Sequence, residues 1–245
     1  MRLKACACSF LASAVFFLSG TSFAASVRDV TFALDRAQKQ PDFLRQAGVI
    51  EESLRQSKSP LPEMLAQLSR AWYLMIEAEK NKDRKKEYIK KSVEAADRAL
   101  QADPGQTHAL YWRSMSLLQD ADVSGGFAGL RDVKVALKGL EAVSAKEPAY
   151  DFAGAYRSRG KVLIEAPAWA FIGDKKKGLE LLRKATEVAP GTLVNRLYLA
   201  QAYKANGQVD NARKEIEYIR KAPLGSDPDD DREIKQEAEK LYNNL

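Results

Sequence analysis

The sequence predicts an all-α solenoid of stacked helical hairpins, with about five helix pairs and a C-terminal capping helix. Five prolines recur at gaps of 44, 44, 42 and 33 residues: Pro60, Pro104, Pro148, Pro190 and Pro223. Each ends a stretch with the apolar periodicity of an amphipathic helix, and the residue before a proline disfavours helical backbone. No segment shows convincing strand alternation. Helices that end at a recurring interval are typical of a stacked helical repeat.

The clearest repeat covers residues 193–223. Its key positions are Arg196, Leu199, Ala200, Tyr203, Ala212, Ile216 and Pro223. Their spacing resembles the tetratricopeptide (TPR) pattern W-x2-L-G-x2-Y…A-x3-F…P, with an alanine where glycine is usual. Small Ala200 and Ala212 fit a close crossing of two helices, and Gly207 fits a helix C-cap.

The repeat over residues 151–190 is the next clearest. Gly160 stands where Ala200 stands in the following repeat, and Ala185 lies on the second helix. This repeat has extra residues at its central joint, within the apolar segment 164–172. Pro167 cannot sit inside a regular helix, so we expect this segment to form a loop.

The earlier repeats carry insertions at the same joint. We expect a loop over residues 120–130 in the repeat 107–148, and an insertion over residues 77–87 in the repeat 62–104. Loops at one joint of three successive repeats would gather on one edge of the solenoid, where repeat proteins often bind. Helices within 26–40 and 42–60 open the array. The segment 230–245 closes it, with acidic residues in its first turn.

Residues 1–24 have the features of a secretory signal peptide. Arg2 and Lys4 precede a short apolar run, and small residues lie around Ala24. The alternative is an uncleaved anchor, although the run is too short to span a bilayer. Because no cysteine lies near the cut, lipidation is not expected. The predicted mature domain, residues 25–245, is therefore periplasmic, without a membrane span.

Cysteine content and charge narrow the function classes. Cys6 and Cys8 both lie in the predicted signal peptide, so the mature chain has no disulfide, thiolate metal site or cysteine nucleophile. The precursor carries a net charge of +6, part of it in the basic run at residues 80–91. That run could contact anionic lipid or nucleic acid, but a solvated helix start is the simpler interpretation. Export makes a nucleic-acid partner less plausible still.

The chain contains no set of residues for catalysis, and we expect no cofactor. His108 is the only histidine, without acids at ligand spacing, so neither a triad nor a zinc site is predicted. No phosphate-binding glycine loop or calcium loop is present. The sequence therefore favours a binding protein that is not an enzyme.

Residues 148–162, 165–169 and 173–190 resemble the T-component family of TRAP transporters. Members of that family are exported, all-helical proteins with degenerate TPR-like repeats and an "aP.W" insertion before a helix that begins G-D. The resemblance implies a periplasmic accessory protein that associates with a substrate-binding component, in a family that includes oligomers with a central channel. Family members are lipoproteins, whereas this sequence has no lipobox cysteine.

Residues on the first helices and in the inserted loop are the candidate contacts with a ligand or partner: Tyr111, Met115, Tyr156, Arg157, Lys161, Trp169 and Phe171. First helices line the concave side of TPR arrays, so Arg157 and Lys161, at i and i+4, could bind a carboxylate. Ordinary solvated charge is the alternative for these two. The inserted loop either folds back as a plug or stands exposed as a contact.

Two functions fit these features. The first is an exported scaffold for a protein partner, such as the substrate-binding component of a TRAP-type system. The alternative is a carrier of a small apolar or organic-acid ligand in a cleft of the helical array. A homo-oligomer is compatible with both.

Overall fold

The computed structural model describes residues 25–245 except residues 38, 58–60, 167–169 and 226. In this part of the chain it has eleven α-helices and no strand, which confirms the predicted fold class. The helices are α1 (Val27–Arg36), α2 (Gln40–Gln56), α3 (Pro62–Ala78), α4 (Lys82–Ala102), α5 (Thr107–Ser124), α6 (Gly126–Lys146), α7 (Tyr150–Glu165), α8 (Lys175–Val188), α9 (Leu193–Ala205), α10 (Val209–Lys221) and α11 (Pro228–Tyr242). The predicted signal peptide and Trp169 lie outside the described residues.

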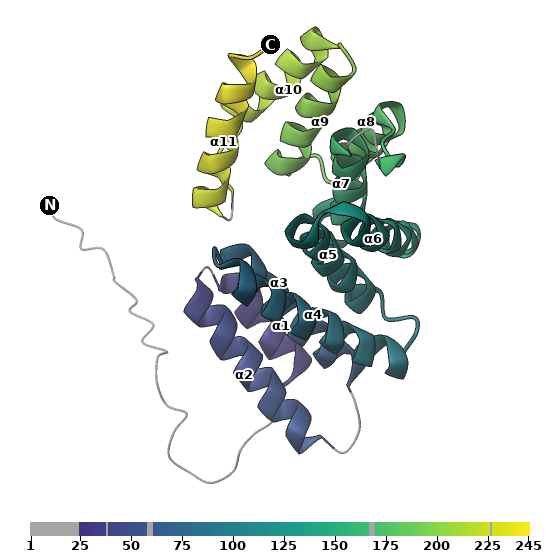
Figure 1. Ribbon diagram of the computed structural model, residues 1–245. Helices are drawn as coiled ribbons and strands as arrows, with labels where there is room; N and C mark the ends of the chain where they lie inside the picture. The colour runs from purple at the N-terminus through teal and green to yellow at the C-terminus, as the bar shows by residue number, and fades with distance from the viewer. Residues whose placement is uncertain (1–24, 38, 58–60, 167–169, 226) are drawn as a thin grey trace, which may run out of the picture.

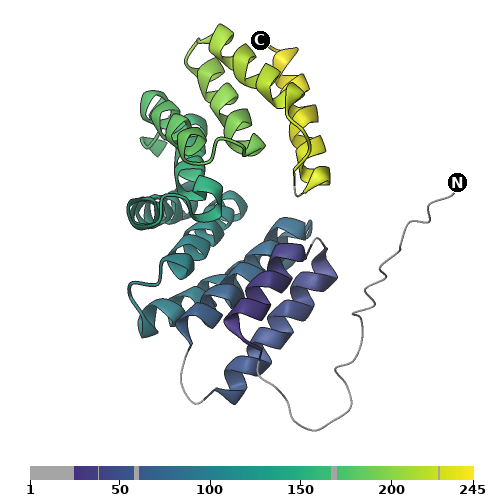
Figure 2. The same cartoon turned by 180° about the vertical axis from the view of Figure 1, so that it is seen from behind.

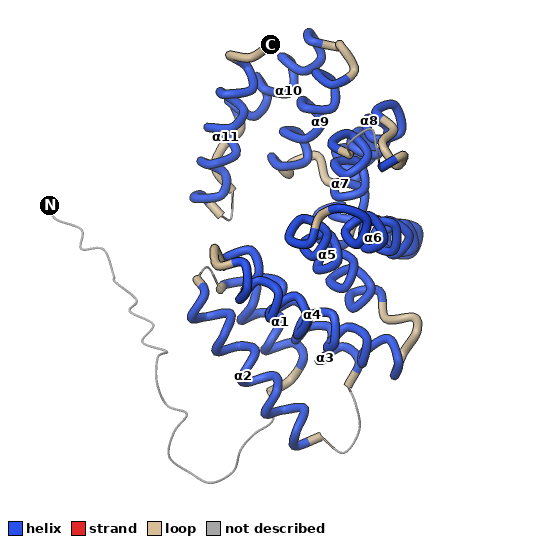
Figure 3. Tube along the Cα trace, viewed as in Figure 1, coloured by secondary structure: helices blue, strands red, loops and turns tan. Residues whose placement is uncertain are grey.

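Helices α1 to α10 form five consecutive hairpins, and α11 packs against α9 and α10 at the C-terminal end. Figures 1 and 2 show the hairpins stacked in a curved array, so that α11 turns back toward the N-terminal pairs. Figure 3 shows that loops are confined to the joints between helices. None of the helices described is both long enough and apolar enough to cross a membrane.

The regularly spaced prolines lie just beyond the second helix of each pair. The last residues of α4, α6, α8 and α10 are each followed two positions later by a proline: Pro104, Pro148, Pro190 and Pro223, respectively. A proline here disfavours helical backbone in the residue before it, so the chain leaves the helix and turns into the next hairpin. Pro60 lies outside the described residues.

The predicted packing of the last repeat is confirmed. Ala200, Ala212 and Ile216 are fully buried between α9 and α10, whereas Leu199 is buried against Leu179 and Leu182 of α8. Gly207 has a φ of +73°, a left-handed conformation that glycine adopts without steric cost, and it ends α9 as predicted.

Helices α7 and α8 approach closely through two glycines. A Cβ atom added to Gly160 would lie 2.6 Å from Cγ of Leu182 and 3.0 Å from the carbonyl oxygen of Gly178. A Cβ atom added to Gly178 would lie 2.9 Å from Cγ1 of Ile164. Real Cβ atoms do not approach other atoms as closely as 2.6 or 2.9 Å, so glycine on both helices allows this close crossing.

The predicted loop over residues 120–130 is wrong. Helix α5 continues to Ser124 and α6 begins at Gly126, so the joint is Gly125 alone, with a φ of +64°. A Cβ atom at Gly129 would lie 2.7 Å from the carbonyl oxygen of Ala121, so glycine allows the two lengthened helices to pack against each other. The insertion therefore extends both helices.

The insertion over residues 77–87 is also mostly helical. Helix α3 ends at Ala78 and α4 begins at Lys82, where the Asn81 side chain accepts hydrogen bonds from the backbone N–H groups of Asp83 and Arg84. Because of this cap, α4 begins within a segment whose charged residues suggested a loop. The third joint behaves as expected, since α7 ends at Glu165, before Pro167.

Candidate functional site

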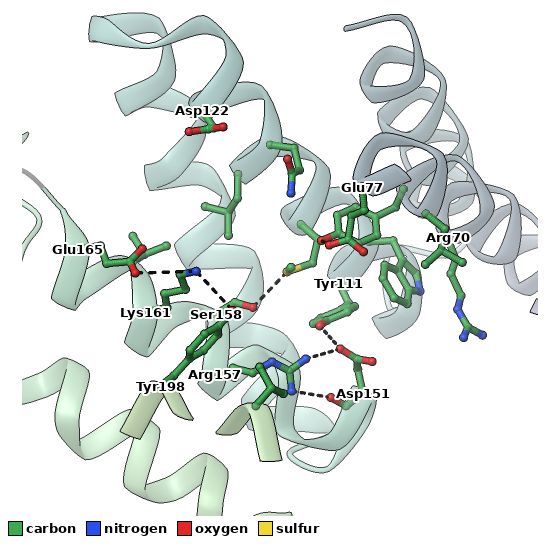
Figure 4. A pocket seen from close by; sticks show the side chains of 18 of the residues that line it. Arg70, Glu77, Tyr111, Asp122, Asp151, Arg157, Ser158, Lys161, Glu165 and Tyr198 are labelled. Carbon is green, nitrogen blue, oxygen red and sulfur yellow. Dashed lines mark hydrogen bonds and ion pairs between the residues drawn. The ribbon is translucent and has the colours of Figure 1, made fainter. Parts of the chain in front are cut away.

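A cavity of about 690 Å³ lies on the inner side of the curved array. Its walls come from α3, α5, α7 and α9, the first helices of four successive pairs, and from α11. The aromatic side chains in its lining are Tyr73, Tyr111, Trp112 and Tyr198. The charged ones are Arg70, Arg157, Lys161, Glu77, Asp122, Asp151, Glu165 and Asp230. Figure 4 shows most of these side chains converging from different helices.

The structure brings four of the predicted contact residues together on this cavity: Tyr111, Met115, Arg157 and Lys161. Tyr156 lies elsewhere, since its hydroxyl group donates to the carbonyl oxygen of Ser144 on α6 at 3.3 Å. Phe171 is not part of the lining, and Trp169 lies outside the described residues. Phe171 therefore lies outside the cavity that Tyr111, Met115, Arg157 and Lys161 line.

The exposure of Phe171 leads to a prediction about stability. Its side chain is 92% exposed, so Phe171→Ser should change the free energy of unfolding by less than about 0.5 kcal/mol. Urea denaturation measures this, with Leu179→Ala as a control that should cost about 2–5 kcal/mol because Leu179 is buried. A cost above about 1 kcal/mol for Phe171→Ser would mean that the loop packs back onto the protein as a plug.

Asp151 is the centre of a hydrogen-bond network at the base of the cavity. Its carboxylate accepts a hydrogen bond from the Tyr111 hydroxyl group of α5 and one of 2.8 Å from Nη2 of Arg157 (Figure 4). Tyr111 is fully buried, and the Arg157 side chain is only 15% exposed. Burial together with the Asp151 carboxylate raises the pKa of Tyr111 well above its usual range, so Tyr111 stays a hydrogen-bond donor.

The backbone at Asp151 has an unusual conformation. Asp151, Phe152 and Ala153 have φ values of +49°, +52° and +64°, the left-handed region that costs a residue with a Cβ atom about 1–2 kcal/mol. Nη1 of Arg157 donates to the carbonyl oxygens of Asp151 and Phe152 at 3.2 and 3.3 Å. The guanidinium group thus holds the strained turn in place. Strain of this kind clusters at functional sites.

Asn195 of α9 completes this network. It is fully buried, and its Nδ2 donates to the carbonyl oxygens of Phe152 at 3.0 Å and Ala185 at 3.2 Å. Its Oδ1 accepts from Nη1 of Arg157 at 3.1 Å. Asn195 was not predicted from the sequence. The sequence does contain one signal for it. Asn195, Leu199 and Ala202 lie at i, i+4 and i+7 on the buried face of α9, so asparagine stands where an apolar residue is expected.

Two cations of the cavity lie over aromatic rings. The Lys161 ammonium group is 4.5 Å from the centre of the Tyr198 ring and 3.8 Å from the Glu165 carboxylate. The Arg70 guanidinium group lies 5.6 Å from the Trp112 ring centre. Each such contact contributes about 0.5–1 kcal/mol at an exposed site.

Three carboxylates of the cavity have no salt bridge to a lysine or arginine among the described residues: Glu77, Asp122 and Asp230. The Tyr73 hydroxyl group donates to Glu77 at 2.6 Å. Water reaches Glu77, yet the surrounding helices desolvate it and raise its pKa above the usual range. Desolvation raises the pKa of Asp230 too, and the neighbouring Asp227 adds to this shift.

A second cavity, of about 810 Å³, adjoins the first. It lies between the start of α7, the α8–α9 joint and the start of α11. Arg157, Val194 and Asp230 line both cavities, so the two cavities are neighbours that share these side chains.

The histidine and the acidic residues do not form a metal site in the described part of the chain. No group of three His, Cys, Asp or Glu side chains there is placed to hold an ion. Nε2 of His108 lies 3.2 Å from the Glu147 carboxylate, and its ring stacks on Tyr150 at 4.2 Å. His108 thus joins two successive repeats.

Fold and concave surface together define a TPR-like helical repeat protein. TTC0263, a TPR protein of the thermophile Thermus thermophilus, is similar with a TM-score of 0.63 and 17% identity, over 87% of this chain and 98% of that chain. MamA from Desulfovibrio magneticus RS-1 (a form spanning residue 41 to the end) is similar with a TM-score of 0.52 and 21% identity, over 80% and 94% of the two chains. At these identities the likeness shows the fold alone.

One family model matches part of the sequence. The model described as "Regulator of microtubule dynamics protein 1-3" matches residues 32–134, less than half of the chain. That region precedes residues 148–223, in which the resemblance to T-components lies. The comparisons do not show the T-component resemblance, and no curated protein sequence matches this chain.

Proposed function

We propose that this chain is an exported scaffold, without enzymatic activity, that binds a segment of a partner protein on its concave face. The observation that carries the proposal is the cavity formed by the first helices of four successive pairs and by α11. TPR-like arrays present such concave surfaces for binding. The strained turn at Asp151 and the network that fixes it keep the walls of the cavity rigid, which lowers the entropy cost of binding.

Export rests on the predicted signal peptide at residues 1–24. The expected mature N-terminus is near Ala25. Intact mass spectrometry of the protein recovered from the periplasmic fraction tests this. Retention of residues 1–24 would contradict cleavage.

The finer proposal is a T-component of a TRAP-type transport system. It rests on the sequence resemblance over residues 148–223, with a periplasmic substrate-binding component as the partner. The partial match to the microtubule-regulator family competes with it, because that match covers the N-terminal repeats. Co-purification with a periplasmic substrate-binding component would support the T-component role, and its absence under native conditions would count against it.

A carrier of a small ligand is the alternative function, and the size of the cavity favours it. About 690 Å³ is within the range of small-molecule sites. An organic acid would meet five carboxylates in the lining, so a neutral or cationic ligand fits better. Native mass spectrometry of the purified mature protein separates the two functions. A retained small molecule supports the carrier, whereas a bound protein supports the scaffold and also reports any homo-oligomer.

A further inference from the structure

The charge of the concave cavity is opposite in sign to that of the whole chain. Three cationic and five acidic side chains line the cavity, which gives it a formal charge of −2, whereas residues 25–245 carry +4, the +6 of the full sequence without Arg2 and Lys4. An excess of one sign of charge in a concave site with low-dielectric walls focuses the field and raises the local concentration of oppositely charged groups. The cavity therefore attracts cations.

The cavity already holds its own cations in a consistent way. Lys161 lies between the Tyr198 ring and the Glu165 carboxylate. Arg70 lies over the Trp112 ring and pairs with Asp35 of α1 at 2.7 Å. In both cases the positively charged group lies near one aromatic ring and one carboxylate.

Glu77 and Asp230 line the same cavity, and neither forms a salt bridge with a lysine or arginine among the described residues, although the positive charge of Arg157 acts to lower the pKa of both carboxyl groups. Glu77 lies in the last turn of α3, in the second helix pair, and Asp230 lies in the first turn of α11, so two helices far apart in the sequence line one cavity. Desolvation is the main cause of the raised pKa of Glu77, and the negative charges of Asp151 and Asp230 add to it, whereas Arg157 acts against it. The carboxylates of Glu77 and Asp230 therefore repel each other across the cavity that both of them line. A cation between them would replace this repulsion with two attractions, next to the Tyr73 hydroxyl group that orients Glu77.

We propose that the concave cavity binds a lysine- or arginine-containing segment of a partner protein, with a cationic side chain between Glu77 of α3 and Asp230 of α11. This inference rests on the proposed function and names the chemistry of the partner. The occupant is a peptide segment because a second cavity of about 810 Å³ adjoins the first and shares Arg157, Val194 and Asp230 with it. A single amine would leave most of these two cavities unfilled.

Fluorescence anisotropy with two labelled probes tests the proposal. One probe is a short peptide of alternating lysine and alanine, and the other is its glutamate counterpart of equal length. At about 150 mM salt, where long-range surface attraction is screened, the lysine peptide should bind at least about tenfold more tightly. Equal affinity, tighter binding of the glutamate peptide, or no binding of either would overturn the proposal.

Two variants with the same change in net charge distinguish binding in the cavity from general electrostatic attraction to the protein surface. The cavity variant combines Glu77→Gln, Asp122→Asn and Asp230→Asn. The control combines Glu94→Gln, Glu187→Gln and Asp210→Asn, at side chains that are 61%, 65% and 90% exposed outside the cavity. The cavity variant should weaken lysine-peptide binding at least about tenfold and the control less than about twofold. Equal loss in both would contradict the assigned site.

The folding of the variants is checked separately. Circular dichroism and thermal unfolding should show both variants folded, and Glu77→Gln alone serves if the combined variant fails to fold.

Spermidine tests whether the occupant is a free polyamine instead of a peptide. If it binds as tightly as the lysine peptide, the occupant is a polyamine and the peptide proposal is wrong. If the protein shows no preference for the lysine peptide but still binds a partner on the concave face, this inference is wrong and the proposed function stands. Failure of the inference and failure of the proposed function are therefore distinguishable.

Discussion

Replacing Arg157 with methionine should destabilise the protein by about 2–4 kcal/mol. Methionine keeps the length of the side chain but removes the donors to the Asp151 carboxylate, the strained carbonyl groups and Asn195. Breaking a buried ion pair by removing one partner costs about 3–5 kcal/mol. The expected cost is somewhat lower here because the Asp151 side chain is 29% exposed and water can reach it. Urea denaturation monitored by circular dichroism measures the change.

The matched control is Arg183→Met on α8. Arg183 is exposed, its Nε donates a hydrogen bond of 3.2 Å to the Tyr203 hydroxyl group, and its guanidinium group lies 5.2 Å from the centre of that ring. It should cost less than about 1 kcal/mol. If the two variants lose the same stability, the network around Asp151 does not hold the left-handed turn, and the argument for a rigid cavity wall fails.

Gly160→Leu should destabilise by about 1–3 kcal/mol through overpacking. The new side chain would meet Leu182 and the backbone of Gly178, which cannot withdraw without separating α7 from α8. The gain in helix propensity, about 1 kcal/mol, opposes this loss only in part. Thermal unfolding measures the result.

Gly48→Leu is the matched control for this second prediction. Gly48 lies within α2, is exposed, and a Cβ atom there would meet nothing within 4 Å. The same substitution should leave stability unchanged or raise it by up to about 1 kcal/mol. A stable Gly160→Leu protein would contradict the close approach of α7 and α8.

The sequence predicted most of the fold because its signals are local. Pro104 and Pro148 mark the ends of second helices, and Ala200 and Ala212 mark a close crossing. The joints were less predictable. Glycine and charged residues suggest loops, whereas tertiary packing at Gly129 and a local cap lengthen the helices instead.

The candidate site could be predicted in part. Arg157 and Lys161 follow from the rule that first helices line the concave side. Glu77 and Asp230 do not, because only the curvature of the whole array brings α3 and α11 to one cavity. The left-handed turn at Asp151 has no sequence signal either, since no glycine occupies residues 151–153.

Photocrosslinking from the cavity tests the central claim, that the concave face binds the partner. The photoreactive amino acid p-benzoylphenylalanine would replace Gln119, which lines the cavity, or, as a control, Lys184 on α8, which is 52% exposed outside it. Irradiation in a periplasmic extract of the source organism, followed by mass spectrometry, should identify one recurring protein joined at position 119 and absent at position 184. Adducts at position 184 only, the same adducts at both positions, or none at position 119 would contradict a binding role for the concave face.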